Sequence, residues 1–129
     1  MSRNWIVVAG GVVLVAGCAT ANGPVSEVQR LQAQSSYEQG VSALSERQLG
    51  VALTALQQAT TVDPTVGSYR NALGIVHLQL GRPEQALKEF QEAVRIDPDY
   101  AEAMLNIGVA HAELQRWPEA VAAYQRALR

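Results

Sequence analysis

The sequence is short of aromatic residues, cysteine and basic charge, and each shortage excludes a class of protein. Aromatic residues make up only 5% of its 129 residues, which argues against a β-sandwich or barrel because such folds are rich in them. A single cysteine allows neither an internal disulfide framework nor a multi-cysteine zinc site. The formal net charge of −2 provides no basic surface, so we expect no nucleic-acid partner.

Helix-forming residues are abundant instead. The chain has twenty alanines, and Ala, Leu, Gln and Glu, which all favour helix, dominate it from residue 26 onward. Its length allows one domain of ordinary size and no separate catalytic domain. We therefore predict an all-α domain over residues 26–129, with a capping box of Ser26 and Gln29 at its start and an apolar stripe beginning at Val28 and Leu31.

Residues 1–17 have the composition of a bacterial signal peptide. Arg3 is the only charged side chain before Glu27, and an apolar run from Trp5 to Gly17 follows it. As a helix this run would reach roughly 20 Å, which is too short for a hydrocarbon core of about 30 Å. Its length is typical of the apolar region of a cleaved leader.

The only cysteine directly follows this apolar run. The stretch Val15-Ala16-Gly17-Cys18 resembles the lipobox of bacterial lipoproteins, in which the leader is removed before the cysteine and acyl chains are added to it. The resemblance implies a lipidated Cys18, a tether over residues 18–25, and, with Ala19 next, a location at the outer membrane facing the periplasm. The alternative is an uncleaved anchor with an incidental cysteine, but the small and polar residues that follow suit lipid poorly.

A period of 34 residues dominates the rest of the chain. Five positions recur with the same residue type or the same size in successive units: Gly40, Gly74 and Gly108; Ala52, Ala86 and Ala120; Leu56, Phe90 and Tyr124; Ala59, Ala93 and Ala127; Asp63-Pro64 and Asp97-Pro98. Each unit has two stripes of apolar residues at helical spacing, separated by a turn such as Gly81-Arg82-Pro83. The period therefore predicts pairs of antiparallel helices that cross closely at their glycines and alanines.

The middle unit resembles the tetratricopeptide repeat (TPR), whose signature is W-x₂-L-G-x₂-Y, A-x₃-F, A and P. The matching residues are Arg70-x₂-Leu73-Gly74-x₂-His77, Ala86-x₃-Phe90, Ala93 and Pro98, with Arg and His in place of Trp and Tyr.

The resemblance extends to the units on either side. It implies an α-solenoid of three helix-turn-helix repeats over residues 33–66, 67–100 and 101–129, the third of them incomplete. The first repeat is degenerate, because Gln39 and Ala43 stand where apolar bulk is expected.

Catalytic signatures are missing from the sequence. It contains no H-E-x-x-H, C-x-x-C, G-x-S-x-G, Walker or G-x-G-x-x-G motif. His77 and His111 hold equivalent places one repeat apart and are interpreted as filling an aromatic position between paired helices. Asp63 and Asp97 precede prolines and are typical of turns. We therefore predict no catalytic residues, cofactor or metal, and keep an enzyme only as a remote alternative.

TPR proteins bind ligands in a groove lined by the first helix of each pair, and the resemblance assigns such a groove here. Its predicted residues are Tyr37, Glu38, Val41, Leu44, Ser68, Asn71, Ile75, Leu78, Gln79, Glu102, Leu105, Asn106, Val109 and Glu113. None of them is Lys or Arg, which excludes the carboxylate-clamp type that holds a chaperone's C-terminus. An apolar floor with an acidic rim suits an apolar peptide, helical or extended. The alternative is that some of these side chains only pack between repeats.

The leader and the repeats together imply a membrane-anchored scaffold that binds another protein or peptide of the bacterial cell envelope. The order of lipobox, short tether and TPRs resembles the type IV pilus pilotins, which help assemble the outer-membrane secretin, although those carry more repeats. Similar TPR lipoproteins act as adaptors for cell-wall synthases or outer-membrane assembly, which is the second hypothesis.

The sequence stops at Arg129, without the extra helix that usually covers the last pair of a TPR array. We therefore expect parts of Val121, Tyr124 and Leu128 to face water. In use this face would be covered by self-association, by a partner, or by residues missing from a truncated sequence.

Overall fold

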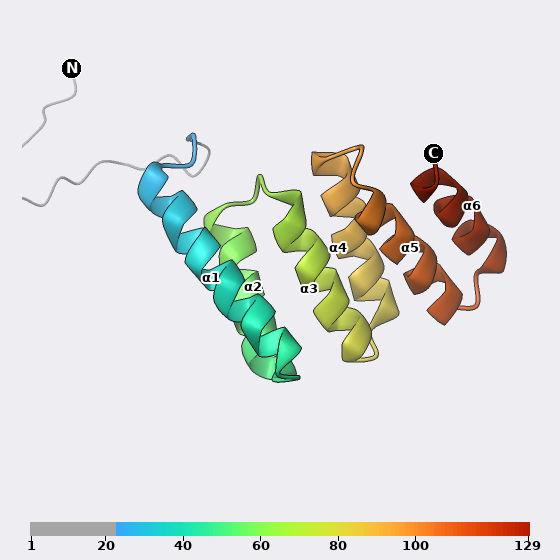
Figure 1. Ribbon diagram of the computed structural model, residues 1–129, viewed down its shortest axis with the longest axis horizontal. Helices are drawn as coiled ribbons and strands as arrows, with labels where there is room; N and C mark the ends of the chain where they lie inside the picture. Colours follow the sequence, from blue (N-terminus) through green and yellow to red (C-terminus); the bar gives the residue numbers. More distant parts are fainter. Residues whose placement is uncertain (1–22) are drawn as a thin grey trace, which may run out of the picture.

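The computed structural model describes residues 23–129, and this part of the chain forms helices and no strand (Figure 1). The helices are α1 (Glu27–Ser45), α2 (Leu49–Val62), α3 (Gly67–Gln79), α4 (Pro83–Ile96), α5 (Ala101–Glu113) and α6 (Trp117–Ala127). They follow one another along the long axis as three helix-turn-helix units. The antiparallel helix pairs predicted from the 34-residue period, and the all-α solenoid that the TPR resemblance implies, are confirmed.

The predicted leader over residues 1–17 and the lipidation site Cys18 lie outside the described residues, so both stay predictions. Among the helices of residues 23–129, none is both long enough and apolar enough to cross a membrane.

Helix α1 begins at the predicted capping box. The backbone N–H of Gln29 donates to the Ser26 hydroxyl at 3.2 Å, and the Ser26 N–H donates to the Gln29 side chain at 2.8 Å. The expectation for Val28 and Leu31 was wrong, because they are 64% and 59% exposed. The buried stripe of α1 starts at Ala33, and Val28 and Leu31 point roughly 140° and 160° away from it at 100° per residue.

The turn inside each unit contains one residue in the left-handed region. Arg47, Gly81 and Gln115 have φ values of 60°, 71° and 58°, and they are spaced by the 34-residue period. The residue after each donates its N–H back to a carbonyl in the last turn of the preceding helix, at 2.8–2.9 Å. Only glycine adopts this conformation at little cost, so Arg47 and Gln115 are strained where Gly81 is not.

The variant Gln115→Gly should raise the free energy of unfolding by about 1 kcal/mol, because glycine relieves the left-handed strain. The Gln115 side chain is exposed, so little packing is lost. Urea denaturation followed by circular dichroism measures the change. Gln115→Ala, which keeps a Cβ, is the control and should not stabilise the protein; equal stability of the two variants would contradict this account.

Glycine in the first helix of each unit lets the second helix approach closely, as the sequence predicted. A Cβ added at Gly74 would overlap the Phe90 ring, and one added at Gly108 would overlap the Tyr124 ring. Gly40 faces Leu56 in the same way. These contacts set the spacing inside each pair.

The array is curved, and its inner side is formed by the first helices. Each unit packs its second helix on the next first helix, through contacts of α2 with α3 and of α4 with α5. Within residues 23–129, α1 also contacts α3 and α3 contacts α5, whereas α2 does not reach α4, nor does α4 reach α6. The first helices therefore lie closer together, and we call the concave surface of α1, α3 and α5 the A-helix face.

Candidate functional site

The structure places the predicted groove residues on α1, α3 and α5, but they are not equally available to a ligand. The exposed ones are Glu38, Val41, Gln79, Glu102, Leu105 and Glu113. The half-buried ones are Tyr37, Leu44, Ser68, Ile75, Leu78, Asn106 and Val109, and Asn71 is buried. Leu44 packs against the hydrophobic cluster that joins the first two units. Ile75 and Leu78 pack against a second cluster, which contains Phe90 and joins the second and third units. Part of the set therefore joins repeats, and the exposed part is left for a ligand.

A polar network joins α3 to α5 on the A-helix face. Asn71, only 3% exposed, donates from Nδ2 to the Glu102 carboxylate at 3.2 Å. Its Oδ1 accepts from Nδ2 of Asn106 at 2.9 Å. The amide of Asn71 is therefore satisfied in a buried position, where an unpaired polar group is costly, and it holds the Glu102 carboxylate in place.

Tyrosines from successive units adjoin this network. The rings of Tyr37 and Tyr69 have centroids 4.9 Å apart with a 32° tilt. Burial is the main cause that raises the pKa of Tyr100, and the Glu102 carboxylate and the Tyr37 phenol raise it further, whereas the Asn71 amide acts in the opposite direction. Three first helices thus bring together aromatic rings and a carboxylate.

The pKa of Tyr69 is also raised, mainly by burial and then by Asp63, Tyr37 and Glu38. Neighbouring anions make it harder to ionise a phenol. Burial is therefore the first cause of both pKa shifts, and nearby carboxylates raise the two pKa values further. The sequence did not single out either tyrosine as a site residue, because their spacings do not follow the 34-residue period.

The acidic groups of the A-helix face have no cationic partner. Ion pairs within residues 23–129 join Arg30 to Glu27, Arg70 to Glu89 and Arg95 to Glu92, and none of them involves Glu38, Glu102 or Glu113. Helix α5 contains no Lys or Arg at all.

Arg70 has a structural role that the sequence did not reveal. It occupies the position of Trp in the repeat signature, and its guanidinium lies 3.1 Å from the Glu89 carboxylate, so that it joins α3 to α4. Both side chains are about three-quarters buried or more. A charged pair therefore takes the place of an aromatic ring inside this unit, and Arg70 is not available to a ligand.

The surroundings of His77 and Asp63 indicate structural roles for both side chains. His77 is buried, its Nδ1 has no hydrogen-bond partner, and burial lowers its pKa, with Arg82 acting in the same direction and Glu89 against it. The buried Asp63 accepts hydrogen bonds from the backbone and hydroxyl of Thr65, as a turn residue does. In residues 23–129, no three His, Cys, Asp or Glu side chains are grouped to hold a metal ion.

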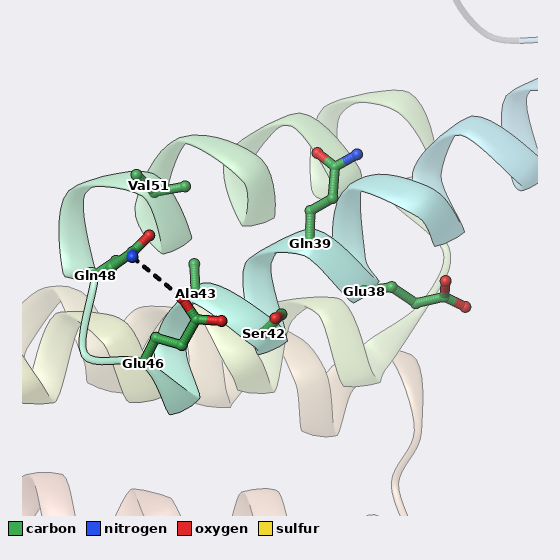
Figure 2. A pocket seen from close by; sticks show the side chains of 7 residues that line it. All are labelled: Glu38, Gln39, Ser42, Ala43, Glu46, Gln48 and Val51. Carbon is green, nitrogen blue, oxygen red and sulfur yellow. Dashed lines mark hydrogen bonds between the residues drawn. The ribbon is translucent and has the colours of Figure 1, made fainter.

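The degenerate first repeat leaves a shallow hollow between α1 and α2 (Figure 2). Gln39 and Ala43, which stand where apolar bulk was expected, both line it, and the Glu46 carboxylate accepts from the Gln48 amide at 3.1 Å. The lining holds two carboxylates, those of Glu38 and Glu46, and a serine hydroxyl, and it contains no His, Cys, Lys or Arg.

The last helix is exposed along part of its apolar face. Val121 and Leu128 face water, and Tyr124 is half-buried, as the sequence led us to expect. Self-association through this face is not tested by the structure and stays a prediction.

Comparison with known proteins identifies the family. The tetratricopeptide-repeat profile matches residues 37–101 and 71–129, which is most of the chain, and the chain therefore belongs to the TPR family. A search of curated proteins finds no match.

Solved TPR structures have the same arrangement of helices. The TPR domain of Arabidopsis OM64 is 26% identical, with a TM-score of 0.76 over 78% of this chain and 83% of that one. MamA is 25% identical, with a TM-score of 0.72 over 75% of this chain and 57% of its own length. The second TPR domain of Spaghetti (RPAP3), bound to the HSP90 peptide SRMEEVD, is 22% identical, with a TM-score of 0.76 over 80% of this chain and 97% of that one.

The family defines the class of function. A TPR array is a protein–protein interaction module, and its repeats are generally not catalytic. The concave A-helix face exposes Leu105 and carries the carboxylates of Glu38, Glu102 and Glu113, which form no ion pair within residues 23–129.

Proposed function

We propose that this protein is a lipid-anchored scaffold of the bacterial cell envelope that holds a partner protein by a segment bound on its A-helix face. The observation that carries the proposal is the lipobox-like Val15-Ala16-Gly17-Cys18 placed directly before a TPR array. The groove residues predicted from the sequence, which lie on α1, α3 and α5, provide the binding surface.

The length of chain between the proposed anchor, Cys18, and the first helix of the array is compatible with membrane attachment. The first helix begins at Glu27, nine residues after Cys18, so an extended tether reaches roughly 30 Å at about 3.4 Å per residue. Several acyl chains on one cysteine give stable anchoring where a single chain is marginal. The array would therefore stay close to the membrane surface and still be free to bind a partner.

Within this class, the order of lipobox, tether and repeats favours one specific role, that of a type IV pilus pilotin. In that role the partner is the outer-membrane secretin, whose assembly the scaffold would assist. The second candidate, an adaptor for cell-wall synthases or outer-membrane assembly, has the same architecture and differs in the partner.

The variant Cys18→Ser tests the anchor. In cells supplied with radioactive palmitate, the wild-type chain should become labelled and Cys18→Ser should not, because serine lacks the thiol that accepts the lipid. Ala19→Ser, which makes the same size of change one residue later, is the matched control and should keep its label. Unchanged labelling of Cys18→Ser would refute the lipid anchor.

A photo-reactive residue at position 105 tests the partner. Leu105 is 46% exposed on the A-helix face, whereas Lys88 is exposed on α4, outside this face, and provides the control position. Irradiation of living cells should link position 105, and not position 88, to one partner. A secretin subunit supports the pilus role and a cell-wall synthase the adaptor role, whereas identical products from both positions would contradict binding on the A-helix face.

A further inference from the structure

The A-helix face has a fixed carboxylate that lacks a counter-ion. Glu102 is exposed in the first turn of α5, and Asn71 on the neighbouring helix α3 holds one of its oxygens at 3.2 Å. Within residues 23–129 no Lys or Arg pairs with it, and α5 contains no Lys or Arg. A pre-positioned charge loses little side-chain freedom on binding, so it favours a cationic ligand more than a mobile glutamate would.

Tyrosine rings and a second carboxylate lie on the same A-helix face. The rings of Tyr37 on α1 and Tyr69 on α3 have centroids 4.9 Å apart, and Tyr100 directly precedes α5, two residues before Glu102. Glu38 follows Tyr37 on α1 and forms no ion pair within residues 23–129. A cation beside aromatic faces and carboxylates gains both cation–π attraction and charge-assisted hydrogen bonds.

On the basis of the proposed function, we propose that the segment bound on the A-helix face carries a lysine or arginine side chain that binds the Glu102 carboxylate next to the Asn71 amide. The charge complementarity identifies the occupant as a basic segment. The exposed Leu105, one turn along α5 from Glu102, adds an apolar contact. The ligand is therefore a segment with a basic residue next to an apolar one.

The same charges disfavour acidic peptides. The HSP90 peptide SRMEEVD, bound to the second TPR domain of Spaghetti, contains three acidic residues and one arginine. On this chain its carboxylates would meet Glu38 and Glu102 without a cation to offset them.

Random peptides displayed on phage and selected against the purified full chain test this proposal. Peptides selected by the wild type should be enriched in Lys or Arg next to an apolar residue. Peptides selected by Glu102→Gln should lack that enrichment. Glu84→Gln removes an exposed carboxylate from α4, so it is the matched control and should preserve the enrichment.

The variant Leu105→Asp separates failure of this proposal from failure of the proposed function. If the wild type selects no peptide, or if both Leu105→Asp and the uncharged variant Leu105→Asn bind the selected peptides equally well, the A-helix face is not a peptide site and both fail. If Leu105→Asp abolishes binding but the selected peptides show no basic enrichment, the face binds peptides and only the cation subsite is wrong.

Affinity measurements on one selected peptide locate its cation. Glu102→Gln should raise Kd roughly threefold to fivefold, and changing the peptide's basic residue to Gln should have the same effect. Both changes together should cost no more than either alone, since they remove one interaction. The loss should also shrink at high salt. Additive losses would place the cation elsewhere and overturn the assignment to Glu102.

Discussion

The variant Phe90→Ala should lower the free energy of unfolding by about 3–5 kcal/mol, the usual cost of removing a fully buried aromatic ring. Phe90 is completely buried, and it packs with Ala86, Leu87 and Ala110 at the junction of the second and third units. Since small domains have total stabilities of about 5–15 kcal/mol, much of the protein should unfold at mild urea concentrations. Urea denaturation followed by circular dichroism measures the loss.

Tyr124→Ala is the matched comparison for Phe90→Ala, because Tyr124 holds the same position 34 residues later and is only half-buried. Its loss should be clearly smaller, since less apolar surface returns to water. Equal losses at the two positions, or a loss below about 1 kcal/mol for Phe90→Ala, would contradict the packing of this junction.

The variant Gly74→Ala should destabilise the protein by about 1–2 kcal/mol, although alanine is the better helix former. A Cβ at Gly74 would overlap the Phe90 ring, which is enclosed and cannot move aside. Overpacking of this kind costs about 1–3 kcal/mol, and the gain in helix propensity offsets up to about 1 kcal/mol of it. The midpoint of urea denaturation reports the difference.

Gly50→Ala is the matched control for Gly74→Ala, because nothing lies within 4 Å of a Cβ at Gly50 and the substitution should stabilise α2 slightly. The two core predictions are also coupled. In the Phe90→Ala background the overlap disappears, so Gly74→Ala should there be neutral or stabilising. Full destabilisation by Gly74→Ala without the Phe90 ring would show that this ring is not what the glycine accommodates.

The sequence also predicted the start of α1 correctly, because a capping box is a local motif. Ser26 and Gln29 are three residues apart and need no other part of the chain to form their hydrogen bonds. The buried stripe expected to begin at Val28 and Leu31 was wrong, because both side chains are exposed. Which side of α1 is buried depends on where the neighbouring helices pack, and the sequence of α1 alone does not determine this. The left-handed Arg47 and Gln115 were also missed, since glycine, the usual marker of that conformation, is present only at Gly81.

The candidate site could be predicted only in outline. Placing its residues on the first helices followed from the repeat signature, but the hydrogen bonds of Asn71 reach residues 31 and 35 positions away, neither of which keeps the 34-residue register. Tyr69 and Tyr100 were likewise not apparent as neighbours of Tyr37 and Glu102. Contacts between helices of different units depend on the curvature of the array. The residue type at any one sequence position does not indicate that curvature.

By itself, the sequence determined the class of fold, the close crossings at Gly40, Gly74 and Gly108, and the absence of Lys and Arg from the predicted groove. It could do so because a repeated unit makes the same local contacts each time. Only the tertiary structure decided which groove residues stay exposed and which pack between repeats, and that Asn71 fixes the Glu102 carboxylate. The physical reason is that these features arise where three different helices meet, and their distances depend on how successive units stack.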